Sequence, residues 1–306
     1  MKIVFPELDS NPIAREATSC FPDIKWIAAR RLDEAANYVR IGLADSMISG
    51  LDYSSRDVLL AYKDHLPPTS KYFSSCFVAE HTEPDGATTH LILADGGVNK
   101  QPTPEQYLTL IEDSASTYET YYGEQPRIAL LSYSTYGSGG KNPDSGKFHL
   151  ALDFIRTHHS DWLIDGEMQL DAAISPEVAA KKTPASPLGG RANVLIVPDL
   201  NSGNILYKSL ERFGGFTIAG PIIQGFKMPL ADLSRGSTLE DIILTIKVIL
   251  KLCSEESVGG YDRDRRSASP VTDRPLGRGR GEASTGASDS VSEEHNLRST
   301  IERSIS

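Results

Sequence analysis

Short apolar runs alternate along the chain with longer segments in which apolar residues recur at helical spacing. The runs predict buried strands and the spaced segments predict amphipathic helices. Their alternation is typical of an α/β fold with a largely parallel sheet. We expect strands at 2–5, 45–49, 73–79, 90–94, 127–132, 193–197 and 216–223. We expect helices at 104–121, 145–158, 202–213 and 238–252.

Loops rich in Gly, Ser and Asp follow several predicted strands, as in ADGG (94–97), SYSTYGSGG (132–140) and PDLNSGN (198–204). Ligands in open α/β sheets bind at the carboxyl ends of the strands, so we expect these loops to line a cleft. The run from Gly137 to Gly140, followed by Lys141, offers backbone N–H groups to a phosphate. It has the spacing of neither a P-loop nor a dinucleotide site, and a plain flexible loop explains it equally well.

The segment MPLADLSRGSTLEDI (228–242) precedes and enters one predicted helix. Ser237 and Glu240 have the spacing of a capping box, which predicts that the helix begins near Thr238.

Three polar side chains then surround this helix start: Ser234 and Arg235 in the loop, and Asp241 one turn inside. A helix N-terminus attracts anions, and the arginine fork suits phosphate or an oxyanion. The segment therefore predicts an acyl-transfer or phosphate-handling site. A capped surface helix with solvated charges is the alternative explanation.

Composition narrows the possible partners. The chain has 306 residues, 39% hydrophobic and 24% charged, which is typical of a soluble protein long enough for two domains. Its net charge of -10 argues against a general nucleic-acid binder. No apolar run approaches the roughly 20 residues of a membrane span, and the N-terminus lacks a signal-peptide pattern. We expect no membrane association.

Metal binding is not indicated by the sequence. The three cysteines are far apart, which suggests neither disulfides nor a cysteine metal site and makes the cytoplasm the expected compartment. Asp165, Glu167 and Asp171 form a group of carboxylates without a histidine partner, so a metal site there is disfavoured. After Ser254 large apolar residues almost disappear, and 255–306 is predicted to be a disordered tail.

Six motifs follow one another along the chain: ADSMISG (44–50), LADGGVNKQPTPEQ (93–106), PRIALLSYSTYGSG (126–139), DGEMQLDAAISPEVAAKK (165–182), RANVLIVPDLNSGNILYK (191–208) and GPIIQGFKMPLADLSRGSTLEDI (220–242). The first three are similar to ADxMVSG, ADxAVNxxPxAEQ and PRVAMLSFSTKGS. Through these motifs the chain resembles the phosphate acetyl/butyryltransferase family, and within it the phosphate acetyltransferase (phosphotransacetylase) branch.

The resemblance implies a two-domain fold of the isocitrate/isopropylmalate-dehydrogenase type, with the active site in a cleft between the domains. Residues 1–66 and 227–254 would form a first α/β domain, and 67–226 an inserted second α/β domain. Family members commonly dimerise through the second domain, so a homodimer is expected.

The implied reaction is the reversible conversion of acetyl-CoA and phosphate to CoA and acetyl phosphate, a step of acetate metabolism. The resemblance implies no metal or other cofactor, and coenzyme A takes part as a substrate. Asp241 falls on the proposed general base that takes the thiol proton, Arg235 on the arginine that holds the phosphoryl or carbonyl oxygens, and Ser234 on the serine beside it. The residues expected to bind substrate are Ser134, Thr135, Gly137, Ser138 and Arg56.

The chain also departs from the family. Only some 40 residues precede ADSMISG, so the first domain is predicted to be shortened. One family arginine has no clear counterpart, and its candidates are Arg30, Arg31 and Arg40. A second falls on Leu60, with Arg56 as the nearest substitute.

These losses leave a second function open, in which a catalytically reduced homologue binds acyl-CoA or a phosphorylated metabolite as a regulatory or scaffolding protein. Altered acyl or phosphate specificity is a third possibility. The two functions differ in whether Arg30, Arg31, Arg40 or Arg56 points into the cleft with Arg235, and a cleft with one arginine would favour the binding protein.

Overall fold

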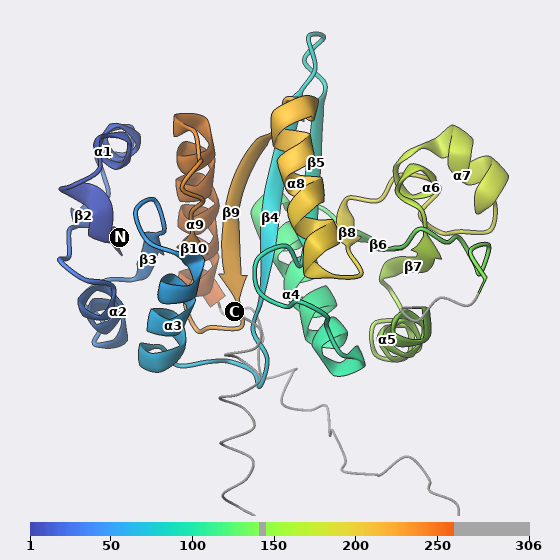
Figure 1. Ribbon diagram of the computed structural model, residues 1–306, viewed down its shortest axis with the longest axis horizontal. Helices are drawn as coiled ribbons and strands as arrows, with labels where there is room; N and C mark the ends of the chain where they lie inside the picture. Colours follow the sequence, from blue (N-terminus) through green and yellow to red (C-terminus); the bar gives the residue numbers. More distant parts are fainter. Residues whose placement is uncertain (141–144, 260–306) are drawn as a thin grey trace, which may run out of the picture. The chain divides into compact units, whose positions relative to one another are not determined.

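The computed structural model describes residues 1–140 and 145–259, and Met1–Ser254 form one compact unit. The described strands of this unit join in one mixed sheet (Figure 1). They are β1 (Lys2–Val4), β2 (Lys25–Ile27), β3 (Ser46–Ser49), β4 (Ser74–Thr82), β5 (Thr88–Ala94), β6 (Arg127–Leu131), β7 (Leu163–Met168), β8 (Val194–Ile196), β9 (Thr217–Gln224) and β10 (Leu230–Asp232). Their order in the sheet is β2-β1-β3-β10-β9-β4-β5-β8-β6-β7.

The helices within the described residues are η1 (Pro6–Leu8), α1 (Pro12–Ser19), α2 (Leu32–Arg40), α3 (Ser55–His65), α4 (Pro104–Tyr122), α5 (Ser145–His158), α6 (Leu170–Ile174), α7 (Pro176–Lys182), α8 (Leu200–Gly214) and α9 (Leu239–Gly259). The α/β class predicted from the sequence is therefore confirmed. Each predicted strand and helix is present, with boundaries shifted by a few residues. The exception is α9, which continues seven residues beyond its predicted end at 252.

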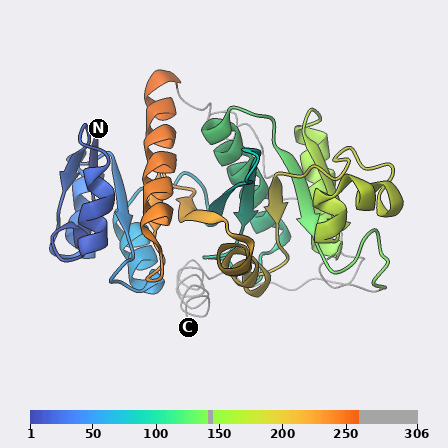
Figure 2. The ribbon, with the colours of Figure 1, turned by 90° about the horizontal axis from the view of Figure 1, so that it is seen from above.

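Strand β4 shows how the helices cover the sheet. Its side chains alternate between the two faces, as the pleat of a strand requires. Cys76 and Val78 pack in an apolar cluster with residues of α4, α5 and α9, whereas Phe77 and Ala79 pack with residues of α6 and α8. Figure 2 shows α4 and α8 on opposite sides of the sheet.

The two ends of the sheet are built differently from its middle. β2, β1, β3 and β10 are parallel to one another, and so are β5, β8, β6 and β7. Between them, β10 pairs antiparallel with β9, β9 with β4, and β4 with β5. The prediction of a largely parallel sheet thus holds for the ends and fails in the middle, where the chain runs back on itself.

The predicted domain boundaries fall between neighbouring strands. Segments 1–66 and 227–254 supply β1, β2, β3 and β10, which are contiguous in the sheet, and 67–226 supplies the remaining strands. The division into two domains stays a prediction. The beginning of the predicted tail is helical, because α9 ends at Gly259, and the rest of that prediction, 260–306, lies outside the described residues. Among the described helices, none has the length and hydropathy needed to cross a membrane.

Thr245 of α9 links this helix to β9. Its hydroxyl accepts a hydrogen bond from Gly220 N at 2.9 Å and donates to the Asp241 carbonyl at 2.8 Å. Replacing Thr245 by Val keeps the shape of the side chain and leaves the Gly220 N–H unpaired, so we expect a loss of roughly 1–3 kcal/mol in the free energy of unfolding.

Chemical denaturation measures this loss, and Thr157→Val is the matched control. Thr157 bonds the carbonyl of Asp153 in the same way, but it is exposed. A loss no larger than that of the control would show that the Gly220 bond contributes little.

Candidate functional site

The loops that follow β3 and β10 lie against each other. The two strands are parallel and in register, with Asp232 opposite Ser49, so their carboxyl ends coincide. Leu233 N donates to the Ser49 carbonyl at 2.6 Å. Gly50 has φ +115, and a Cβ there would lie 2.4 Å from the Leu233 carbonyl oxygen. Only glycine fits this contact between the β3 loop (50–54) and the β10 loop (233–238).

The β10 loop carries two of the predicted site residues. Ser234 is half-buried, and its hydroxyl accepts a hydrogen bond from Gly236 N at 3.2 Å. Arg235 is exposed at the tip of this turn. A further guanidinium approaches from α8, because Arg212 Nη2 would lie 3.5 Å from a Cβ on Gly236. Sequence reasoning missed Arg212, whose position in a plain amphipathic helix gives no sign of this approach.

The capping residues of α9 differ from those predicted. The helix begins at Leu239, and the capping pair is Thr238 with Asp241 instead of Ser237 with Glu240. Thr238 Oγ1 accepts from Asp241 N at 3.2 Å, and Asp241 Oδ2 accepts from Thr238 N at 2.8 Å. The sequence STLED contains two overlapping capping patterns, and spacing alone does not choose between them.

Asp241, the predicted general base, is 4% exposed. Its Oδ2 also accepts from Thr238 Oγ1, and its Oδ1 accepts from Ile218 N of β9, both at 2.8 Å. Both carboxylate oxygens therefore have protein donors, and one lone pair of Oδ1 is left for a further donor. The role of Asp241 as the base stays a prediction.

A carboxylate that sequence reasoning missed lies beside the loop. Asp232, the last residue of β10, is 1% exposed, and its Oδ1 accepts no hydrogen bond from any described residue. Burial raises the pKa of Asp232 to about 7. The negative charge of Glu7 adds to the rise, whereas a hydrogen bond with Ser55 and the charge of Arg235 oppose it.

Glu7 is the second buried carboxylate at this place. It is 1% exposed, and its Oε1 accepts from Gly50 N at 2.7 Å, while its Oε2 has no partner among the described residues. Burial raises the pKa of Glu7 as well, although the Gly50 hydrogen bond opposes this. The β3 loop thus lies next to two carboxyl groups, those of Glu7 and Asp232. Burial makes the ionised form of both unfavourable.

The β6 loop (132–140) brings together the other predicted binding residues. Ser134 and Thr135 are buried, and Ser134 Oγ accepts from Gly139 N at 3.0 Å. Ser138 Oγ accepts from Thr135 N at 2.9 Å, and Gly137 N donates to Glu167 Oε1 at 3.3 Å. The loop is therefore a preformed turn that uses several of its own N–H groups. Lys141, which follows it, lies outside the described residues.

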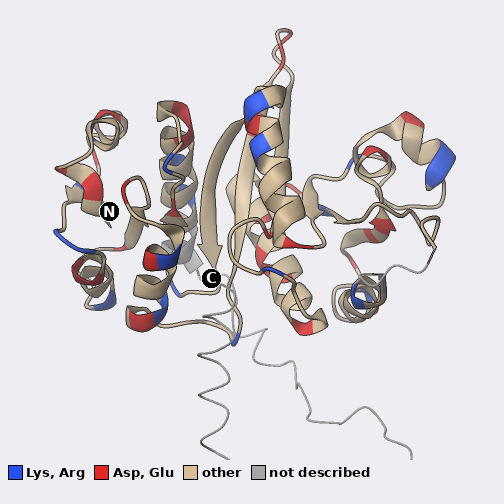
Figure 3. Cartoon of the chain, viewed as in Figure 1, with Lys and Arg blue, Asp and Glu red and all other residues tan. Residues whose placement is uncertain are grey.

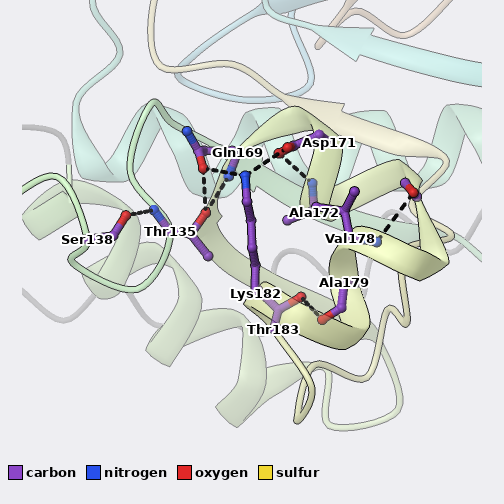
Figure 4. A network of polar contacts seen from close by, with 10 residues as sticks. Thr135, Ser138, Gln169, Asp171, Ala172, Val178, Ala179, Lys182 and Thr183 are labelled. Carbon is purple, nitrogen blue, oxygen red and sulfur yellow. Dashed lines mark hydrogen bonds and ion pairs between the residues drawn. The ribbon is translucent and has the colours of Figure 1, made fainter.

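Figure 4 shows how the β6 loop is fixed to the next element. Thr135 Oγ1 accepts from Gln169 N at 3.1 Å, and Lys182 Nζ bonds Gln169 Oε1 at 2.9 Å and Asp171 Oδ2 at 2.7 Å. Lys182 belongs to the basic C-terminal end of α7, visible in Figure 3. Asp171 is therefore paired with a lysine, and Asp165 accepts from Arg156 at 3.0 Å.

Of the candidate replacement arginines, Arg56 is exposed in the first turn of α3, the helix that follows the β3 loop. Arg31 pairs with Asp33 at 2.6 Å, and Arg40 bonds Asn37, so both are held by their own helix.

Sequence comparison with known proteins gives the same family as the motifs. The family model described as "Phosphate acetyl/butaryl transferase" matches residues 21–250. The phosphate acetyltransferase of Treponema pallidum is 41% identical over 221 residues, which are 71% of this chain and 66% of that protein. The enzyme of the same name from Thermoanaerobacterium thermosaccharolyticum is 40% identical over 208 residues, 67% of this chain and 63% of that protein. The chain thus spans about two-thirds of the length of these relatives.

Solved structures of phosphotransacetylases are similar to this chain in fold. A phosphotransacetylase from Streptococcus pyogenes superposes with a TM-score of 0.72 at 28% identity, over 83% of this chain and 94% of that chain. The EutD phosphotransacetylase of Staphylococcus aureus gives a TM-score of 0.68 at 25% identity, with the same coverage of both chains.

Asp232→Asn should stabilise the fold in a pH-dependent way. The folded protein holds the Asp232 proton up to about pH 7, whereas the ordinary pKa is 3.8, so the stability of the native chain falls as the pH rises between these values. The amide carries no charge and avoids this loss. We expect a gain on the order of 2 kcal/mol at about pH 8 and much less at about pH 4.5, measured by denaturant unfolding at both. An equal gain at both pH values would contradict the assignment.

Gly50→Ala should disrupt the contact between the β3 and β10 loops. The new methyl group would meet the Leu233 carbonyl, and we expect a loss of about 3 kcal/mol or more in thermal or denaturant unfolding. Gly42→Ala is the control, because Gly42 also has positive φ but nothing lies within 4 Å of its Cβ position. It should cost only about 1 kcal/mol. Similar losses in both variants would mean that backbone conformation, not the loop contact, requires glycine at position 50.

Proposed function

Because the chain belongs to the phosphate acetyl/butaryl transferase family, we propose that it transfers an acetyl group reversibly between coenzyme A and inorganic phosphate. Acetyl-CoA and phosphate would give CoA and acetyl phosphate. The observation that carries this proposal is the β10 loop, where Ser234 and Arg235 lie at the joined ends of β3 and β10 and directly before the N-terminus of α9. Relatives at about 40% identity are named phosphate acetyltransferases.

The proposed chemistry places negative charge at this loop. When a thiolate attacks the acetyl carbon, charge develops on the carbonyl oxygen, and a preorganised donor there contributes about 3–4 kcal/mol. Arg235 and Ser234 would supply such donors. The guanidinium of Arg212 and the dipole of α9 add positive potential at the same place, which suits the phosphoryl group.

The resemblance assigns the general base to Asp241. A thiol of pKa about 8.5 is mostly protonated at neutral pH, so a nearby acceptor is needed. In this role Asp241 would accept the thiol proton at the lone pair of Oδ1 that the bond from Ile218 N leaves free. Its capping bonds fix the start of α9, so its replacement would also affect folding.

The proposal extends to substrate binding and assembly. Ser134, Thr135, Gly137 and Ser138 of the β6 loop, together with Arg56, are proposed to bind coenzyme A or phosphate. The support is the family motif and the position of the β6 loop at the carboxyl end of its strand. A homodimer, which follows from the resemblance, and a cytoplasmic location, which follows from the separated cysteines, are likewise proposed.

One observation favours the alternative, a catalytically reduced homologue that binds acyl-CoA or a phosphorylated metabolite. Leu60 stands where the family has an arginine, and Arg31 and Arg40 bond residues of their own helix. Arg212 also lies beside the β10 loop, near Gly236, but its Nη2 pairs with Glu211 of its own helix at 3.0 Å.

The test is CoA-dependent consumption of acetyl phosphate, followed as thioester formation. We expect turnover by the intact chain and a loss of about 10²- to 10³-fold in kcat for Arg235→Ala, because a donor to the developing oxyanion is removed. Arg15→Ala, which removes an exposed arginine bonded to the Asp9 carbonyl, should leave the rate unchanged. If the folded chain binds CoA but shows no turnover, the proposal of an active acetyltransferase is wrong and the alternative of a binding protein is supported.

A further inference from the structure

The β6 loop uses its own backbone N–H groups throughout the turn 134–140. Each N–H of this segment donates a hydrogen bond within the protein. Two of these bonds go to Glu167 of β7, because Tyr136 N donates to its carbonyl at 3.1 Å and Gly137 N to its Oε1 at 3.3 Å. The loop is therefore not the open N–H cradle for phosphate that its glycines suggested, but a closed turn anchored on β7.

Tyr136 lies at the centre of this turn. Its φ is +49, a left-handed conformation that bulky residues rarely adopt, and in the described part of the chain it is the one residue other than glycine with positive φ. Such a conformation persists only where the surroundings hold it. The Tyr136 hydroxyl donates to Oδ2 of Asp165 on β7 at 2.5 Å. Burial and this hydrogen bond raise the pKa of Tyr136 to about 12, so the hydroxyl keeps its proton at neutral pH.

Asp165 connects Tyr136 to a cation outside the loop. Its side chain is buried, and a buried carboxylate needs partners for its charge. Its Oδ1 accepts from Arg156 Nη2 at 3.0 Å and from Gly166 N at 2.9 Å, while its Oδ2 accepts from Tyr136. Arg156 belongs to the last turn of α5. The positive charge that balances Asp165 therefore comes from a different element of the fold.

The family motif has a lysine at this position of the loop. STYGS (134–138) is similar to STKGS, and Tyr136 stands where that motif has lysine. A lysine has a long, flexible stem, so its ammonium group at this position could pair with Asp165 directly. Tyrosine keeps a hydrogen bond to the carboxylate but brings no charge. In this chain the exchange is accompanied by a separate cation on the same carboxylate, Arg156.

We propose that Tyr136 is a positioning residue of the β6 loop, and that Arg156 supplies through Asp165 the positive charge that the loop itself lacks. The inference rests on the function proposed above, in which residues 134–135 and 137–138 bind a phosphate group of a substrate. These residues flank Tyr136 on both sides, so its bond to Asp165 fixes their positions. The absent lysine is then not a lost contact to the substrate.

The hydroxyl groups of the turn are the donors that its geometry controls. Ser138 is exposed, and its Oγ accepts from Thr135 N at 2.9 Å, which leaves the hydroxyl hydrogen free to donate to a phosphate oxygen. The place of this donor depends on the turn that Tyr136 holds. A shift of about 1 Å at such a group weakens substrate binding although no substrate contact is deleted.

The experiment measures kcat and the KM values for acetyl phosphate and CoA in a rescue series. Arg156→Met leaves the buried Asp165 carboxylate without its cation, so one KM should rise on the order of 10-fold while kcat changes by less than about threefold. The rise falls on acetyl phosphate if the loop holds the phosphoryl group, and on CoA if it holds a phosphate of CoA. Adding Tyr136→Lys to Arg156→Met should return this KM to within about threefold of the native value.

Tyr133→Lys in the Arg156→Met background is the matched control. It adds the same charge to the same loop, but the Tyr133 ring lies against Gly139, where a Cβ would be 2.6 Å from Cε2, so KM should stay raised. Tyr136→Phe removes only the hydroxyl and should raise the same KM about threefold or more without lowering kcat.

Three results of this series would overturn the inference. The first is that Arg156→Met leaves both KM values unchanged. The second is that Tyr133→Lys rescues as well as Tyr136→Lys. The third is that Tyr136→Phe lowers kcat and leaves both KM values unchanged, since Tyr136 would then act on the reacting atoms. Tyr136→Phe keeps the inference testable if Arg156→Met does not fold.

Calorimetric titration with CoA and with inorganic phosphate needs no turnover and so separates this inference from the proposed function. The Kd of the ligand held by the β6 loop should rise with Arg156→Met and return with Tyr136→Lys. If turnover is absent but this pattern is present, the transferase proposal fails and the positioning role of Tyr136 stands. Identical Kd values across the series, or no binding of either ligand, overturn it.

Discussion

The parallel pairing of β10 with β3 is the constraint on which the site depends. It joins segments far apart in the chain, and Ser46 Oγ adds a bond to the Pro229 carbonyl across 183 residues. Because both strands end at the same level, Ser55 and Arg235, from different segments, come to the same edge of the sheet. Tyr62 reinforces the arrangement by donating to the Ala231 carbonyl at 2.7 Å. Without this pairing, the β10 loop would have no fixed position relative to α3.

Sequence patterns predicted most of the fold because buried strands and long helices leave strong local signals. The strands they missed are instructive. β2 and β10 have only three residues each, and β7 reads LIDGEM, whose charged residues are buried at the sheet edge. The missed helices are short and have small apolar faces: α1, α2, α3, α6 and α7. Whether such short strands and helices form depends on their tertiary packing, which local sequence patterns do not show.

For the site, motifs predicted which residues lie together but not how they are bonded. Ser234 and Arg235 were found because a helix start and an arginine leave a local pattern. Asp232 and Glu7 were not, since burial of a carboxylate depends on residues distant in sequence. Asp241 shows the converse: its position was predicted, while its bonds to Ile218 and Thr238 are visible only in the folded chain.

The side-chain bonds between α9 and β9 have a mechanical consequence. α9 follows β10 in sequence, yet Asp241 and Thr245 attach it to the backbone of β9. β9 and β10 share only two register pairs, compared with six between β9 and β4. α9 therefore bridges the narrow β9–β10 seam: its side chains bond β9, and the β10 loop, which carries Arg235, joins it to β10.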